Sequence, residues 1–225
     1  GSQSELPPLP AVTRGFYLEH PDVTALTDEQ VEEERHRHAI AVYGEAVPNP
    51  ISSFVQASLP PYLLETLLSA GYKQPSAIQR QAWPVALSGR DMVGLAETGS
   101  GKTLAYLLPA LVHVNAQPVL KEGEGPLALL LAPTRELAVQ IHEEAVRFGH
   151  PCGVRSVRSG RVGHFGRIAP ASQLAFLSTI IGTTLIDGAY QGWRKVTALG
   201  LAVLEVELPP VCLPIGSDIA PRTGR

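Results

Sequence analysis

The residues best suited to chemistry in this sequence form one glycine-rich run, Ala96-Glu97-Thr98-Gly99-Ser100-Gly101-Lys102-Thr103. Its two glycines allow the backbone to wrap closely, so that its N–H groups can point at phosphate oxygens. Lys102 can place a positive charge between the β- and γ-phosphates of a nucleotide, and the hydroxyl of Thr103 can ligate Mg²⁺. A short apolar run precedes the motif and a predicted helix follows it, which is the context that a phosphate-binding loop requires.

Two further segments carry polar groups that could serve a ligand. The first, residues 71–79, ends in Gln79, which alone would be an ordinary exposed helix residue. The second is Pro133-Thr134-Arg135-Glu136-Leu137, at the carboxyl end of a predicted parallel strand. Ligands bind at this edge of open α/β sheets, and a hydroxyl, an arginine and a helix N-terminus suit phosphate oxygens. The alternative is that Thr134 and Glu136 only cap a helix.

The elements that must position these residues alternate between strands and helices. Short apolar runs predict buried strands over residues 91–96, 127–132 and 154–157. Periodicity and caps predict helices over residues 61–70, 76–87, 101–114 (with a kink at Pro109) and 136–148, and a short acidic helix after Thr27. This order predicts an α/β fold with a parallel sheet that is covered on both faces.

Composition and net charge exclude a disordered protein and a protein that binds nucleic acid through its overall charge. Of 225 residues, 44% are hydrophobic and 17% are charged, which excludes wholesale disorder. The net charge of −3 means that nucleic-acid binding would need a local patch. Residues 145–186 hold five arginines and no acid, and this stretch is either an RNA-binding surface or a solvated one.

The lack of a recognisable targeting signal and the low cysteine content favour an intracellular protein, in the nucleus or the cytoplasm. Cys152 and Cys212 are too few for a disulfide scaffold or a four-cysteine zinc site, and they suit a reducing compartment. No apolar run approaches the roughly 18 residues of a membrane span. The first residues do not form a secretory signal.

In their order, the segment ending in Gln79, the glycine-rich run and the Pro-Thr-Arg-Glu-Leu segment resemble the N-terminal core of DEAD-box RNA helicases. The p68-like subgroup is the most similar, on residues such as Gly15-Phe16-Tyr17, Pro48-Asn49-Pro50-Ile51 and Gln81-Ala82-Trp83-Pro84. The resemblance covers about residues 14–160. It implies a RecA-like P-loop NTPase sheet, here incomplete, and an ATP-dependent RNA helicase.

The resemblance also implies roles for individual residues. Phe54 would stack near the adenine, and Gln79 would make the paired hydrogen bonds that select this base. Thr134 and Arg135 would touch the RNA backbone without reading its sequence. The whole set implied to bind ATP is Phe54, Tyr72, Gln79, Glu97, Thr98, Gly99, Ser100, Gly101, Lys102 and Thr103. Of these, Lys102 and Thr103 would be catalytic, and Thr103 would ligate Mg²⁺.

The resemblance is lost after about Arg161. The family's next motifs, Thr-Pro-Gly-Arg, Asp-Glu-Ala-Asp and Ser-Ala-Thr, do not occur. Val203-Leu204-Glu205 weakly resembles the strand that leads into the Asp-Glu-Ala-Asp motif. In this alignment Glu205 would replace the first Asp, and Val206 would occupy the position of the catalytic Glu. The alternative is that Glu205 and Glu207 alternate on a half-exposed strand. We therefore divide the chain into an N-terminal extension (1–50), a partial ATP-binding domain (51–161) and a divergent tail (162–225).

This loss predicts impaired hydrolysis, because the missing acids hold the Mg²⁺ shell and position the attacking water. Three interpretations remain open: a working helicase core with a degenerate Asp-Glu-Ala-Asp motif, a non-hydrolysing module that binds ATP and RNA, or an unstable truncated product with an exposed sheet edge. The tail is interpreted as an altered terminus from splicing, a frameshift or a wrong gene prediction.

Overall fold

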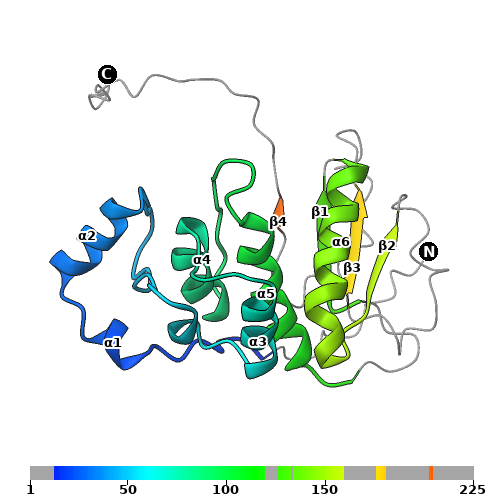
Figure 1. The fold of residues 1–225 in the computed structure, drawn as a ribbon, viewed down its shortest axis with the longest axis horizontal. Helices are drawn as coiled ribbons and strands as arrows, with labels where there is room; N and C mark the ends of the chain where they lie inside the picture. Colours follow the sequence, from blue (N-terminus) through cyan, green and yellow to red (C-terminus); the bar gives the residue numbers. More distant parts are fainter. Residues whose placement is uncertain (1–12, 120–125, 133, 160–175, 181–202, 205–225) are drawn as a thin grey trace, which may run out of the picture.

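The structure is a computed structural model that describes residues 13–119, 126–132, 134–159, 176–180 and 203–204. Its helices are α1 (Pro21–Thr24), α2 (Asp28–Arg37), α3 (Pro61–Ser69), α4 (Ala77–Leu87), α5 (Lys102–Asn115) and α6 (Arg135–Gly149), with the 3₁₀ turns η1 (Phe54–Ala57) and η2 (His150–Cys152). Its strands are β1 (Ala128–Ala132), β2 (Ser156–Ser159), β3 (Phe176–Ile180) and β4 (Val203–Leu204). Figure 1 shows α6 in front of the strands, with α3, α4 and α5 gathered beside them.

The strands form one parallel sheet in the order β2-β3-β1-β4. Strand β1 occupies an inner position, where Leu130 is opposite Ser178 of β3 and Val203 of β4. All five residues of β1 are buried, as expected of an apolar strand in a parallel sheet. The parallel sheet and the strand predicted over residues 127–132 are confirmed, and the strand predicted over residues 154–157 is found two residues later, at β2.

Local capping signals explain the helices, and the helices predicted between residues 61 and 148 are confirmed within a residue or two of their bounds. The acidic helix is α2, where Thr27 Oγ1 accepts from the Gln30 N–H and Gln30 Oε1 accepts from the Thr27 N–H. Helix α6 begins after Thr134, whose Oγ1 accepts from the Leu137 N–H at 3.2 Å. Helix α3 is followed by Gly71 at φ +85°, a conformation that favours glycine.

The strand predicted over residues 91–96 is wrong, because the structure has an unpaired segment there. Its apolar side chains face solvent, with exposed fractions of 90% for Val93 and 77% for Leu95. Hydrogen bonds to a neighbour hold a strand in place, and the sheet of the described residues does not include this segment. An apolar run predicts a buried strand only where a partner strand is present beside it.

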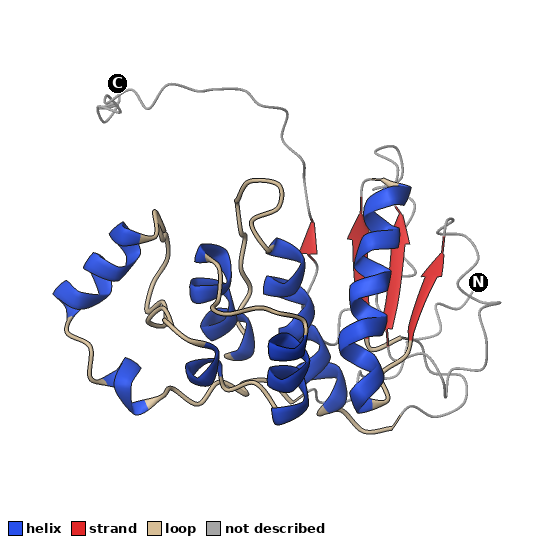
Figure 2. Ribbon diagram, in the orientation of Figure 1, coloured by secondary structure: helices blue, strands red, loops and turns tan. Residues whose placement is uncertain are grey.

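The hydrophobic core lies between the helices and the sheet. Its largest fully buried side chains include Trp83 of α4, Leu107 and Leu111 of α5, and Phe148 of α6. The indole N–H of Trp83 donates to the Leu104 carbonyl at 3.0 Å, so its polar edge is satisfied inside the core. Each such side chain contributes about 1.5–3 kcal/mol on burial, and those of α4 and α5 hold these two helices together. Figure 2 shows these two helices side by side.

The segment before α1 packs onto the far ends of α4 and α5. The backbone N–H groups of Phe16 and Tyr17 both donate to the Leu87 carbonyl, at 2.6 and 3.1 Å. The Phe16 ring meets the edge of the His113 ring at a centroid distance of 4.8 Å. A Cβ on Gly89, which has φ +74°, would lie 2.8 Å from the Arg14 Cβ, so glycine is required for this close approach.

Candidate functional site

The glycine-rich loop of residues 96–103 (the phosphate loop) has the glycine conformations and the following helix expected of a phosphate-binding loop, but not the strand predicted before it. Gly99 and Gly101 have φ values of +78° and +90°, which a side chain would strain. The Ser100 N–H donates to the Glu97 carbonyl at 3.2 Å and closes a turn between them. Helix α5 begins immediately afterwards, so its positive N-terminal end faces the loop.

The side chains of the loop fit an anion and a divalent cation. The Lys102 ammonium bonds two backbone carbonyls, and among the described residues no carboxylate pairs with it. The Ser100 hydroxyl is buried and has no hydrogen-bond partner within the described part of the chain. Thr103 is the second residue of α5 and is half-buried. These groups could hold phosphate oxygens and Mg²⁺.

Gln79 joins its own segment to the loop. Its Oε1 accepts from the Ser76 N–H at 3.0 Å, and its Nε2 donates to the Gly101 carbonyl at 3.0 Å. A Cβ on Gly101 would lie only 2.6 Å from Gln79 Nε2, so the contact depends on glycine. With 3% of its surface exposed, Gln79 is not the ordinary surface residue that its position on a helix alone would indicate.

The two aromatic residues expected near the base pack on the core. Phe54 is 5% exposed, and its ring centroid lies 5.9 Å from that of Trp83. Tyr72 is half-buried against the same core, and its N–H donates to the Leu67 carbonyl at 3.1 Å. Their contacts with adenine stay predictions.

The Thr134–Arg135 pair lies at the start of α6, after the end of β1. Thr134 caps the helix through its hydroxyl, and whether Thr134 and Glu136 only cap the helix stays open. Both residues are exposed, and Arg135 has no ion pair among the described residues. Figure 1 shows the start of α6 and the loop before α5 at the same edge of the sheet, toward which β1 points. The structure therefore brings the candidate RNA contacts and the phosphate loop to one edge.

Shifted pKa values lie away from this edge. Burial lowers the pKa of His113, which is about three turns along α5 from Lys102. Burial also raises the pKa of Tyr17 to about 12.

Sequence reasoning missed Arg80, which follows Gln79 and is 4% exposed. Its partner is Glu34 of α2, at 3.1 Å and 46 residues away along the chain. An arginine next to a glutamine on a helix gives no local signal of burial, so only the three-dimensional arrangement reveals this pair.

The parallel sheet and the loop before α5 are typical of nucleotide-binding α/β domains. The profile of the DEAD/DEAH box helicase family matches residues 76–199, more than half of the chain. The chain belongs to this family, as the sequence predicted.

Named relatives support the predicted p68-like subgroup. The chain is 54% identical to ATP-dependent RNA helicase dbp2 of Aspergillus clavatus, over 68% of this chain and 28% of that protein. It is 56% identical to probable ATP-dependent RNA helicase ddx17 of Dictyostelium discoideum, over 96% of this chain and 29% of that protein. The crystal structure of the RNA helicase Prp28 from Chaetomium thermophilum bound to ADP is similar with a TM-score of 0.61 and 34% identity. The match covers 72% of this chain and 40% of Prp28, so the chain spans less than half of each relative.

The RecA-like fold is confirmed by the likeness to Prp28. Within the described part of the chain, none of the helices has the length and apolar character needed to cross a membrane.

Proposed function

We propose that this chain is the nucleotide-binding part of an ATP-dependent RNA helicase and binds ATP with Mg²⁺. The observation that carries the proposal is the bond of 3.0 Å from Gln79 Nε2 to the Gly101 carbonyl. It joins a segment that could read a base to a loop that could hold the phosphates of the same nucleotide. Both ligands, ATP and RNA, are found inside the cell, in the nucleus and the cytoplasm.

The proposed roles follow the chemistry of each group. The N–H groups from Thr98 to Gly101 would surround phosphate oxygens, and Lys102 would neutralise their charge. Thr103 would ligate Mg²⁺, which would supply positive charge to offset that of the phosphates. Gln79 would bond adenine through the second lone pair of its Oε1 and the second hydrogen of its Nε2, while it keeps its bonds to Ser76 and Gly101. Phe54, Tyr72 and Glu97 would border the base and the loop.

RNA would lie along the edge where Thr134 and Arg135 are exposed. A guanidinium at the start of a helix suits a backbone phosphate and carries no information about base sequence. The proposed partner is therefore RNA of any sequence, held by its backbone.

Hydrolysis by this chain is proposed to be impaired. Glu205 follows the two residues of β4, which run parallel to β1, but Val206 has no carboxylate to position water. Loss of this acid removes a group that phosphoryl transfer requires. We also propose a division into an extension (1–50), a partial ATP-binding domain (51–161) and a divergent tail (162–225), although the family profile continues to residue 199.

Steady-state ATP hydrolysis with and without single-stranded RNA tests the proposal, together with ATP binding by fluorescence titration. We expect ATP binding with little or no turnover. RNA-stimulated turnover that is lost in Glu205→Gln would contradict the impairment and assign a carboxylate to Glu205. Absence of ATP binding by a chain that unfolds cooperatively would contradict the nucleotide-binding role itself.

A further inference from the structure

The buried guanidinium of Arg80 lies one residue after Gln79, and its surroundings link the N-terminal extension to the nucleotide site. Its NH1 donates to Glu34 Oε1 at 3.1 Å and to the Ser52 carbonyl at 3.1 Å. Its NH2 donates to Gln74 Oε1 at 3.4 Å. A buried cation needs an anion nearby, and Glu34 is the only acid that pairs with it among the described residues.

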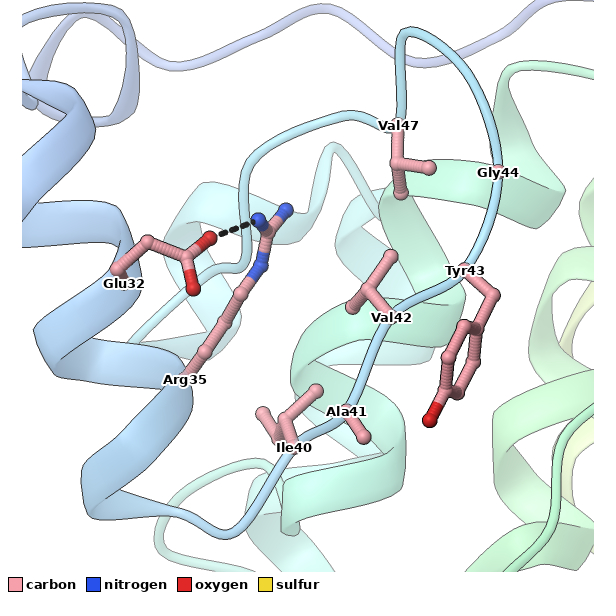
Figure 3. Close-up of a pocket in the computed structure, with 8 residues that line it drawn as sticks. All are labelled: Glu32, Arg35, Ile40, Ala41, Val42, Tyr43, Gly44 and Val47. Atoms are coloured by element: carbon pink, nitrogen blue, oxygen red, sulfur yellow. Dashed lines mark hydrogen bonds and ion pairs between the residues drawn. The ribbon is translucent and has the colours of Figure 1, made fainter. Parts of the chain in front are cut away.

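A second contact between α2 and α4 involves the residues that follow Glu34 and Arg80. Arg35 Nε donates to Gln81 Oε1 at 3.2 Å, and Gln81 Nε2 donates to the Pro48 carbonyl at 2.8 Å. Two successive residues of α2 therefore bond two successive residues of α4. Arg35 NH1 donates to Glu32 Oε1 at 2.7 Å (Figure 3). Arg35 also lines a cavity of about 390 Å³ that the loop of residues 40–47 borders.

These polar contacts largely hold α2 in place. Val31 is the one fully buried residue of α2, all of whose residues are described. A helix with so little apolar burial depends on its ion pair and hydrogen bonds for its position. A change at Glu34 is therefore transmitted to α4 and is not absorbed by a hydrophobic interface.

The first turn of α4 continues to the phosphate loop. Gln79 spans from the Ser76 N–H to the Gly101 carbonyl, and the space between Gln79 and Gly101 has no room for a Cβ. If Arg80 moved outward to reach water, the turn that carries Gln79 would move with it. The loop would then lose a contact that fixes its shape.

We propose that Glu34 is a positioning residue, which neutralises Arg80 and thereby holds Gln79 against the phosphate loop. The extension then tunes nucleotide affinity and base selectivity from outside the site. This inference rests on the proposed function, because the effect of Glu34 is measured as a change in nucleotide affinity.

The test compares Glu34→Gln with Glu33→Gln in the full chain. Both variants remove one acid of α2 that pairs with Arg37. Within the described part of the chain, Glu33 pairs with Arg37 alone, at 2.9 Å, whereas Glu34 also pairs with Arg80. Titration with fluorescent ATP and GTP analogues should show ATP binding weakened about tenfold in Glu34→Gln, with a smaller loss for GTP, since coupling between sites is typically about 5- to 150-fold. Glu33→Gln should leave both affinities and their ratio unchanged.

Hydrogen exchange gives a readout that needs no nucleotide. Amides of residues 77–80 and 97–101 should exchange faster in Glu34→Gln than in Glu33→Gln, because the local opening energy falls. If Glu34→Gln does not fold, Arg35→Lys keeps the charge, removes the Nε donor to Gln81 and should show the same pattern at smaller amplitude.

Equal exchange and an equal ATP-to-GTP ratio in the two glutamate variants would overturn the role of Glu34. If the chain without substitutions binds no ATP, the proposed function is contradicted. Hydrogen exchange in Glu34→Gln and Glu33→Gln would still decide the role of Glu34.

Discussion

The ammonium of Lys102 donates a hydrogen bond of 2.6 Å to the carbonyl of Ala96, at the other end of the same loop. A second bond, of 2.8 Å, reaches the Glu97 carbonyl. The positively charged ammonium of Lys102 is therefore bonded to two neutral carbonyls, on the exposed residues Ala96 and Glu97. A phosphate would replace them with a charged acceptor, which makes a stronger hydrogen bond.

Lys102→Ala should weaken binding of Mg²⁺-ATP at least about tenfold, since a hydrogen bond to a charged group contributes about 1.5–3 kcal/mol. The melting temperature should change little, because the Ala96 and Glu97 carbonyls can bond water instead. Fluorescence titration and thermal denaturation measure the two effects. Arg155→Ala, at an exposed position near the opposite end of the sheet, is the control. A large loss of stability in Lys102→Ala would show that the lysine holds the loop together.

Arg135→Ala should weaken binding of single-stranded RNA equally for unrelated sequences. It should also reduce the slope of log affinity against log salt by about 1, because one phosphate contact is lost. Fluorescence anisotropy at several salt concentrations measures this slope. Arg155→Ala tests the arginine-rich stretch in the same way, since Arg155 is exposed and precedes β2, at the end of the parallel sheet opposite to Arg135. An unchanged slope in Arg135→Ala would contradict a contact at Arg135, whatever the effect of Arg155→Ala.

Much of the local structure could be predicted from the sequence because its causes are local. Thr27 and Thr134 cap helices within three residues of themselves, so their roles are visible in the sequence. The bond between Gln79 and Gly101 spans 22 residues, and only the resemblance to a family associated these two segments. The pair of Glu34 and Arg80 spans 46 residues and has no sequence signal.

The exposed segment of residues 91–96 allows a direct test of where the sequence prediction and the structure differ. With Val93 90% exposed, Val93→Ser should change the free energy of unfolding by less than about 0.5 kcal/mol. Leu130→Ser in β1, at 4% exposure, should cost about 3 kcal/mol or more through lost apolar burial and a buried hydroxyl. Urea denaturation measures both. A comparable cost at Val93 would mean that the segment is a buried strand after all.

Val93→Ser should also reduce self-association. Val93 and Leu95 present apolar surface next to each other on an unpaired segment, and such surface favours contacts between chains. Sedimentation velocity at increasing concentration would detect the change. Val55→Ser is the control, because Val55 is 69% exposed outside this segment.

Stability should fall as the pH drops below 6.5, in part because of His113. Burial lowers the pKa of His113, the Ala86 carbonyl at 3.0 Å opposes this shift, and Arg14 adds to it. Between the lowered pKa and 6.5 the unfolded chain binds a proton that the folded chain does not, so stability rises with pH across this window. His142 has a pKa lowered mainly by burial and then by Arg158, so it contributes in the same direction.

His113→Gln should therefore show a smaller drop in melting temperature from pH 7.5 to pH 5.5 than the unchanged chain. It should also be less stable at pH 7.5, because the packing of the His113 ring against Phe16 is lost. Calorimetry at the two pH values separates these effects. His150→Gln, at an exposed position, should keep the original pH dependence. A drop in His113→Gln as large as that in the unchanged chain would exclude His113 as a source of acid sensitivity and leave His142 as the group to substitute next.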